Sequence, residues 1–248
     1  MSDRAQTIAD NLARARARVD TAVRAAGRPA DSVALLAVSK KMTPDDVRAA
    51  LAAGQRSFGE NYAQELRDKR AALATDAPAP EWHFIGPLQS NKVKYVAGQV
   101  ALIHSVDSIA LLDAIDAYAA AHGGAPQPCL VQVNVAGEAQ KRGLAPADLP
   151  ALLDRFAAAR AARCHGLMVI PPLGTEPEAS RPQFAALRAL RDREASRARP
   201  NVELRELSMG MSADLEVAIA EGATLVRVGT AIFGARPQPA ASADGSSG

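Results

Sequence analysis

Lys40 stands where a lysine side chain can do chemistry. It follows an apolar run, Val33 to Val38, that is typical of a strand buried on both faces. A lysine amine that loses its proton in a dry site can attack a carbonyl carbon and form a Schiff base, whereas an arginine stays protonated and cannot. A second interpretation is open, in which Lys40 and the adjacent Lys41 begin a solvent-exposed loop.

Arg227 interrupts another apolar run, Thr224 to Thr230. Alternation along a strand places its side chain on the same face as Leu225 and Gly229. A buried guanidinium needs an anionic or lone-pair partner, because uncompensated burial of a charge is costly. A bound ligand would supply that partner, and so would an internal salt bridge to Glu206.

Two short segments near the C-terminus have the composition of a phosphate site. Ser212 precedes a helix expected to begin near Ala213, where it would be the N-cap, and Gly229 and Thr230 follow the last apolar run. Helix N-termini bind anions through their unpaired N–H groups. The same residue types are also common in ordinary turns, so plain turn chemistry is the alternative.

The elements that must position these residues alternate regularly along the chain. Eight short apolar runs predict strands over Val33 to Val38, Ser57 to Glu60, Trp82 to Ile85, Leu102 to Ser105, Cys129 to Val135, His165 to Ile170, Glu203 to Ser208 and Thr224 to Val228. Helices are expected from Thr43 (N-cap) to Gly54, Tyr62 to Ala74, Asn91 to Ala97, Ile109 to His122, Pro146 to Ala161, Glu178 to Ala198 and Ala213 to Glu221.

This alternation predicts a single (β/α)8 TIM barrel in a chain of 248 residues. A doubly wound open sheet is the alternative that periodicity does not exclude. Thr7 to Ala26 forms an extra N-terminal helix whose apolar stripe packs on the barrel, with Arg14, Arg16 and Arg18 expected to face solvent. The expected division is residues 1–30 for this helix, 31–236 for the barrel and 237–248 for a disordered tail rich in Pro, Ala, Ser and Gly.

Composition excludes several classes of function. A net charge of +2 from 29 basic and 27 acidic residues gives no footprint for nucleic acid. No apolar run approaches the roughly 20 residues of a membrane span, and no secretory signal is apparent, so we expect a cytoplasmic protein. Cys129 and Cys164 suit buried thiols in a reducing compartment. The four histidines show no metal-ligand spacing, so no metal is expected.

A Schiff-base lysine, a phosphate cradle and a buried arginine together suggest one ligand with an aldehyde, a phosphate and a ring nitrogen. That ligand is pyridoxal 5′-phosphate (PLP), whose sites pair a lysine with an Asp or Arg at the pyridine nitrogen. A class I aldolase, which is also a phosphate-binding barrel with a lysine imine, is the rival on chemistry alone.

The chain resembles the pyridoxal phosphate homeostasis protein family, also called the proline-synthetase co-transcribed family. The segments that carry the resemblance run in order from residue 35 to residue 234. They are Leu35 to Lys40, Phe58 to Tyr62, Trp82 to Lys92, His104 to Asp107, Val133 to Asn134, Lys141 to Gly143, Gly166 to Met168, Leu207 to Asp214 and Val226 to Gly234.

The resemblance implies a PLP-bearing barrel like the N-terminal domain of alanine racemase. It implies Lys40 as the imine lysine, Arg227 at the pyridine nitrogen and Asn61 close to the cofactor. It further implies that Ser212 and the backbones of Gly229 and Thr230 surround the phosphate.

An arginine at the pyridine nitrogen weakens PLP as an electron sink. The eight βα units use almost the whole chain, so no second domain is expected to supply a catalytic base. The leading hypothesis is therefore a carrier or regulator that holds PLP as a lysine aldimine in vitamin B6 and amino-acid homeostasis. We expect a monomer without catalytic residues, and PLP-dependent apoenzymes as candidate partners. The alternatives are a weak racemase-like enzyme, with Tyr62 or His83 as its base, and the aldolase.

Overall fold

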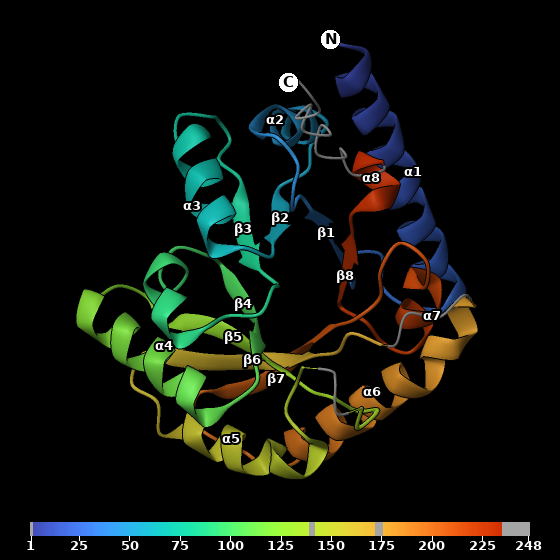
Figure 1. Cartoon of the computed structure of the whole chain (residues 1–248). Coiled ribbons are helices and arrows are strands. Elements are labelled where there is room, and N and C mark those ends of the chain that lie inside the picture. The colour runs from blue at the N-terminus through green and yellow to red at the C-terminus, as the bar shows by residue number, and fades with distance from the viewer. Residues whose placement is uncertain (1, 139–141, 172–175, 235–248) are drawn as a thin grey trace, which may run out of the picture.

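The eight strands close into a parallel barrel, which confirms the predicted (β/α)8 fold over the open sheet (Figure 1). The computed structural model describes residues 2–138, 142–171 and 176–234. Each strand pairs with the next in sequence, and the last pairs with the first. In order, the strands are β1 (Ala34–Val38), β2 (Ser57–Glu60), β3 (Glu81–Phe84), β4 (Leu102–Val106), β5 (Gln127–Gln132), β6 (Ala162–Met168), β7 (Val202–Ser208) and β8 (Leu225–Val228).

Helices follow the strands and form the outer ring of the barrel (Figure 1). The α-helices of this ring are α2 (Pro44–Ala52), α3 (Ala63–Ala72), α4 (Ile109–His122), α5 (Leu149–Ala157), α6 (Arg181–Ala195), α7 (Leu215–Ala220) and α8 (Thr230–Phe233). Three 3-10 helices lie between them, η1 (Ser90–Tyr95), η2 (Pro146–Asp148) and η3 (Pro177–Ser180).

The 3-10 helices are where the observed elements depart from the sequence expectations. The helix expected over 91–97 is the 3-10 helix η1, since a segment this short forms too few α-helical hydrogen bonds to offset nucleation. The helices expected from 146 and 178 each begin as 3-10 turns before α5 and α6. Pro150 and Pro182 stand in the first turn of those α-helices, where the missing N–H of a proline costs no helical hydrogen bond.

The predicted N-terminal helix is α1 (Asp3–Ala25), which contacts α2, α7 and α8 on the outside of the barrel (Figure 1). Its stripe of Ile8, Leu12, Ala15, Val19, Ala22 and Val23 is buried. The expectation that its arginines only face solvent is wrong in part. Arg16 donates to the Ala53 carbonyl at 3.0 Å and Arg18 pairs with Glu216 at 2.7 Å, because both lie at the edges of the buried stripe.

The interior of the barrel holds both apolar and polar side chains. One small cluster of buried apolar residues from four strands, Leu102, Leu130, Met168 and Leu225, fills part of it, while a larger apolar cluster packs the strands against the helices. His104 and Arg227 stand two residues beyond Leu102 and Leu225, so alternation directs them inward as well. The polar layer thus lies toward the C-terminal ends of the strands, where barrels of this fold place their active sites.

Candidate functional site

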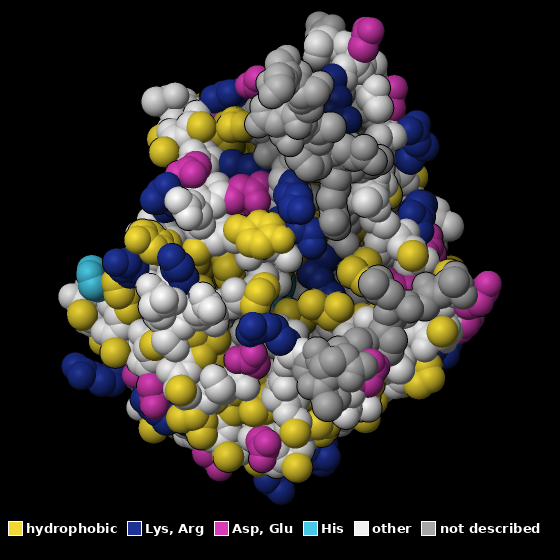
Figure 2. Space-filling model, in the orientation of Figure 1, with side chains coloured by type: hydrophobic (Ala, Val, Ile, Leu, Met, Phe, Trp, Pro, Cys, Tyr) yellow, Lys and Arg dark blue, Asp and Glu magenta, His cyan; other side chains and the backbone are white. Residues whose placement is uncertain are grey.

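A cavity of about 320 Å3 opens at the C-terminal ends of the strands. All the residues predicted from the sequence to bind a cofactor line it, together with apolar neighbours: Val38, Lys40, Asn61, Ile85, Ile170, Met211, Ser212, Ala213, Arg227, Gly229 and Thr230. Figure 2 shows Lys and Arg side chains gathered in the hollow at the centre of this face. Its volume suits a small molecule, for which pockets begin at about 300 Å3.

Closure of the barrel explains why residues so distant in sequence meet. Lys40 follows β1, Asn61 follows β2, and Arg227 lies in β8. Because all the strands are parallel, their C-terminal ends form one rim. The cavity therefore brings together residues from the first and the last strands of the barrel. Lys40 is half-buried and lines the same cavity as Arg227.

Arg227 is almost fully buried, and its hydrogen-bond partners are uncharged. It donates to the hydroxyl of Ser208 at 2.7 Å and to the carbonyl of Val169 at 2.8 Å. The alternative of a salt bridge to Glu206 fails, since that carboxylate accepts a hydrogen bond from Thr224 at 2.5 Å and no ion pair of the described residues joins it to Arg227. Burial lowers the pKa of Arg227 to about 10, against the attraction of Asp214, so the guanidinium is a cation at neutral pH.

Ser212 lines the cavity, but it is not the N-cap of the next helix. That helix, α7, begins at Leu215 with Asp214 as its N-cap residue. The carboxylate of Asp214 accepts the N–H of Met211 at 2.7 Å, which holds the intervening residues in a turn and delays the helix. The hydroxyl of Ser212 instead accepts the N–H of Ala231 at 3.5 Å and so joins the loop after β7 to α8.

Asn61 is held at the cavity by a close approach of two backbones. A Cβ atom on Gly86 would lie 2.0 Å from the carbonyl oxygen of Asn61, so only glycine fits there. The side-chain Oδ1 of Asn61 is buried and has no hydrogen-bond partner. A buried acceptor without a donor is costly, and a ligand is one way to satisfy it.

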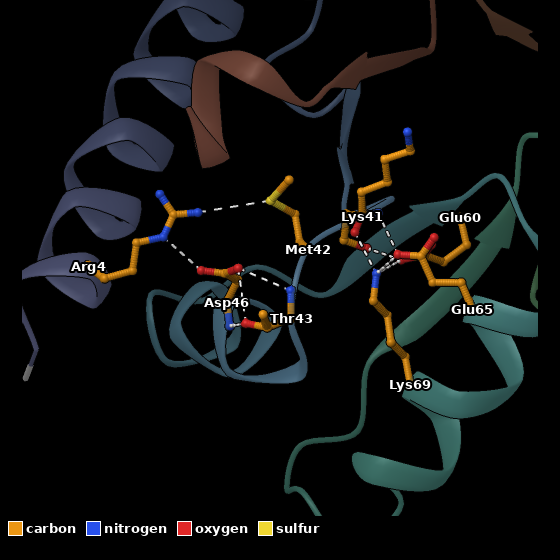
Figure 3. Close-up of polar contacts among 9 residues, drawn as sticks. Arg4, Lys41, Met42, Thr43, Asp46, Glu60, Glu65 and Lys69 are labelled. Carbon is orange, nitrogen blue, oxygen red and sulfur yellow. Dashed lines mark hydrogen bonds and ion pairs between the residues drawn. The ribbon is translucent and has the colours of Figure 1, made fainter. Parts of the chain in front are cut away.

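A buried charged cluster that sequence reasoning missed contacts the residues on either side of Lys40 (Figure 3). The ammonium of Lys69 donates to Glu60 and Glu65, each at 2.7 Å, and to the carbonyl of Ser39 at 2.5 Å. The Ser39 hydroxyl donates to Glu60 at 2.6 Å, and the N–H of Lys41 donates to Glu65. The residues on both sides of Lys40 are therefore fixed to one cluster, which we call the Lys69 cluster.

The Lys69 cluster accounts for two unusual features of its members. Burial raises the pKa of the Glu60 carboxyl, and the attraction of Lys69 opposes the rise. Lys41 adopts a left-handed backbone, with φ of 63°, which is uncommon for a residue with a side chain. Its side chain is exposed and points away from the cluster in Figure 3. A spacing of four between Glu65 and Lys69 was the one local signal in the sequence.

Neither residue considered as a catalytic base lines this cavity. His83 is buried in the barrel, where its ring nitrogens contact His104 at 2.9 Å and Glu81 at 3.0 Å. Tyr62 lines an adjoining cavity of about 380 Å3, which shares Asn61 with the first. Of the described residues around the first cavity, Lys40 and Arg227 are the ones with titratable side chains.

Among the described residues, no group of three or more His, Cys, Asp or Glu side chains is placed to hold a metal ion. No helix within them is long and apolar enough to cross a membrane.

Comparison with known proteins agrees with this geometry. The family model described as "Alanine racemase, N-terminal domain" matches residues 9–237. The "Pyridoxal phosphate homeostasis protein" of Pseudomonas aeruginosa is 49% identical over 230 residues, which cover 93% of this chain and 96% of that protein. The protein of the same name from Escherichia coli is 40% identical over 234 residues, covering 92% and 97%. The chain belongs to the pyridoxal phosphate homeostasis protein family.

Solved structures extend the family comparison to three dimensions. PipY of Synechococcus elongatus, solved with PLP bound, has a TM-score of 0.80 at 41% identity, over 92% of this chain and all of PipY. Alanine racemase from Corynebacterium glutamicum has a TM-score of 0.68 at 16% identity, over 92% of this chain and 60% of the racemase. The homeostasis family thus shares the barrel fold of the racemase, as the resemblance in sequence predicted.

Proposed function

We propose that this chain binds PLP through Lys40 and helps to keep vitamin B6 and amino acids in balance, without robust turnover of its own. The observation that carries the proposal is that Lys40, Arg227, Asn61, Ser212 and the Gly229–Thr230 segment line one cavity. The homeostasis proteins and PLP-bound PipY, alike over most of this chain, support the same ligand.

The chemical groups around the cavity fit the three functional groups of this ligand. PLP supplies an aldehyde that accepts an amine, a pyridine ring that withdraws electrons and a phosphate dianion. Lys40 is the amine at the cavity. Ser212, with the backbone of Gly229 and Thr230 at the start of α8, offers donors for the phosphate. The orphaned Oδ1 of Asn61 is an acceptor still without a donor.

Arg227 determines what kind of PLP site this is. It lines the cavity and its hydrogen-bond partners are uncharged; at neutral pH it donates hydrogen bonds and cannot accept them. A pyridine nitrogen beside it is therefore held unprotonated, which weakens the stabilisation of a carbanion. Lys40 and Arg227 are also the titratable groups of the described lining, so no second base stands opposite the lysine there. Both features favour holding a cofactor over transforming an amino acid.

The wider proposal concerns the chain's organisation and partners. We take residues 31–236 as the cofactor-binding unit and 1–30 as a packed extension. The predicted tail over 237–248 lies outside the described residues. PLP-dependent apoenzymes are the proposed recipients of the cofactor, and a monomer is the proposed state. The two unlinked buried thiols, Cys129 and Cys164, suit a reducing compartment, and we propose the cytoplasm.

A weak racemase-like enzyme is the second candidate function. The observation in its favour is Tyr62, which lines the cavity that adjoins the proposed cofactor site through Asn61. The third candidate is a Schiff-base aldolase without PLP. It predicts a colourless protein whose Lys40 forms a covalent adduct with a sugar phosphate.

Visible absorbance tests the proposed function. The purified chain is mixed with PLP, freed of excess ligand by gel filtration and scanned, beside Lys40→Ala and the matched control Lys41→Ala. We expect a yellow protein for the wild type and for Lys41→Ala, and a colourless one for Lys40→Ala. A wild type that stays colourless rejects the cofactor, and robust racemase, transaminase or decarboxylase turnover by the yellow protein rejects the holding role.

A further inference from the structure

A continuous line of hydrogen bonds crosses the barrel interior from Arg227 to Glu81, at the N-terminal end of β3. The guanidinium of Arg227 lies 2.7 Å from Ser208 Oγ, which lies 2.9 Å from His104 Nδ1. His104 Nε2 lies 2.9 Å from His83 Nδ1, and His83 Nε2 lies 3.0 Å from a carboxylate oxygen of Glu81. Four strands, β3, β4, β7 and β8, contribute to it.

This line is unusual because barrel interiors are mostly filled by branched apolar side chains. His104 and Ser208 are completely buried, and His83 and Arg227 nearly so. Buried polar groups are expensive unless they are all paired, and here each one is. The proposed cofactor site uses only Arg227, so the remaining members need another explanation.

The hydrogen positions along the line follow from its acidic end. A carboxylate only accepts, so His83 must carry its hydrogen on Nε2 and donate to Glu81. Neutral His83 then accepts at Nδ1, which requires that His104 donate from Nε2. Neutral His104 accepts at Nδ1, so the Ser208 hydroxyl donates to it and accepts from Arg227. Every bond thus points the same way, from the cation to the carboxylate.

The charges that face the line are consistent with neutral histidines. Burial holds the pKa of His104 well below its ordinary value, and the neighbouring His83 and the charge of Arg227 lower it further. The hydrogen bond from His83 lowers the pKa of Glu81, which also accepts from the Ser57 hydroxyl at 2.9 Å. Glu81 is half-exposed, so water reaches the line at that end.

We propose that His83, His104 and Ser208 form a relay that orients Arg227 and transmits protonation at the Glu81 end of the barrel to the cofactor side. His104 and Ser208 are positioning residues, since they act on the ligand only through Arg227. The link to PLP rests on the proposed function, whereas the relay itself is a property of the protein alone.

Protonation of His83 reverses the relay without breaking any covalent bond except N–H and O–H bonds. A proton taken from water onto His83 Nδ1 makes that nitrogen a donor, so His104 must accept at Nε2 and move its own hydrogen to Nδ1. Ser208 then faces two donors, His104 and Arg227, and its own hydrogen loses its acceptor. This change weakens the hydrogen bond between Ser208 and Arg227 that orients the guanidinium. Through Arg227, it alters the hydrogen bond to the ring nitrogen of the ligand.

Imidazole nitrogen NMR on the cofactor-free protein tests the relay directly. The chain has four histidines, so 15N-labelled side chains give a simple spectrum that single His→Gln variants assign. At pH above the titration of His83, we expect both His83 and His104 as Nε2–H tautomers. As His83 titrates, His104 is expected to change to the Nδ1–H form. His104 in the Nδ1–H form at high pH, or unchanged as His83 titrates, would overturn the relay.

The PLP-loaded protein tests the link to the cofactor. We expect the visible maximum to shift with pH at the midpoint that NMR gives for His83. His83→Gln keeps an acceptor for His104 and a donor for Glu81, so its affinity for PLP should change by less than about threefold while the shift disappears. His165→Gln, on β6 outside the relay, is the matched control and should keep the shift. A shift that persists in His83→Gln rejects the link. Failure to bind PLP rejects the proposed function instead, and the NMR result still decides the relay.

Discussion

The two sides of the cavity hold their basic residues by opposite means. On the Lys40 side, the protein supplies formal charges of both signs: Lys69 is buried against Glu60 and Glu65, and the cluster fixes the backbone on both sides of Lys40. On the Arg227 side, the hydrogen-bond partners are a hydroxyl and a carbonyl, and the carboxylate of the relay lies beyond Ser208 and two histidines.

The difference indicates which charge the protein balances and which one it leaves for a ligand. The Lys69 cluster pairs its cation with carboxylates inside the fold, so its role is to shape the loop that carries Lys40. Arg227 is oriented by neutral acceptors, which fix its direction while leaving its charge available. A site that must hold an anionic cofactor through a ring nitrogen and a phosphate needs this second arrangement.

The largest effect on stability is expected from a substitution in the Lys69 cluster, on the Lys40 side of the cavity. Lys69→Met leaves the buried carboxylate of Glu60 without its cation, which costs about 3–5 kcal/mol of unfolding free energy. Urea unfolding of the cofactor-free protein measures this, with the exposed Lys94→Met as the control. The double variant Glu60→Gln/Lys69→Met should regain most of the loss. Equal stability of the Lys69 and Lys94 variants would contradict the account of the cluster.

A substitution on the Arg227 side of the cavity should change the affinity for PLP more than the stability of the protein. Arg227→Met leaves no carboxylate without its cation, so the unfolding free energy of the cofactor-free protein should change by less than about 2 kcal/mol. Its affinity for PLP should fall about 10- to 100-fold, the value of a charge-assisted hydrogen bond. Fluorescence or absorbance titration gives the affinity. The contrast between the two sides disappears if Arg227→Met unfolds as readily as Lys69→Met.

Two buried carboxylates near the Lys40 loop should give stability opposite pH dependence (Figure 3). Burial would raise the pKa of Asp46, but hydrogen bonds from Arg4 and from Thr43, which caps α2, lower it overall. Its contribution is therefore complete above the ordinary value near 3.9 and is lost as pH falls through the folded value. Burial raises the pKa of Glu60, so its contribution is complete below about 4.3 and is lost as pH rises through the folded value.

Variants separate these two dependences. Asp46→Asn should lower the unfolding free energy at neutral pH by about 1 kcal/mol, as the loss of a helix cap does. It should also flatten the acid limb of a plot of unfolding free energy against pH. Glu60→Gln should flatten the limb above about pH 4.3. Urea unfolding between pH 3 and 8 tests both. An acid limb as steep in Asp46→Asn as in the wild type would reject the role given to Asp46.

The smallest effect is expected at Lys41. Replacing it with glycine relieves a left-handed backbone but frees the unfolded chain, and the two contributions, each about 1 kcal/mol, nearly cancel. We expect a change in stability within about 0.5 kcal/mol and an unchanged yellow colour with PLP. A colour lost in Lys41→Gly would move the reactive amine from Lys40 to its neighbour.

The sequence predicts the barrel and the residues around the cavity well, because local patterns determine both. Alternating apolar runs specify strands and helices, and the ends of parallel strands must share a rim. Lys40 and Arg227 stand out because each follows or interrupts an apolar run. The expectation for Ser212 as an N-cap was wrong because Asp214 accepts the N–H of Met211 and holds these residues in a turn, so that α7 begins only at Leu215.

Contacts between separate elements could not be predicted. Lys69 meets Glu60 only because α3 packs across the end of β2, and neither residue alone signals the cluster. His83 and His104 are 21 residues apart, and nothing in their spacing indicates a contact. Their pairing depends on the register between β3 and β4, which no single segment specifies.

Trapping the lysine that carries the cofactor tests the central claim most directly. The protein is loaded with PLP, reduced with borohydride, digested and mapped by mass spectrometry, with Lys40→Ala treated in parallel. The account predicts one phosphopyridoxyl group, on Lys40, and none in the variant. A label on Lys41 or Lys69 in the wild type, or no label at all, would contradict it.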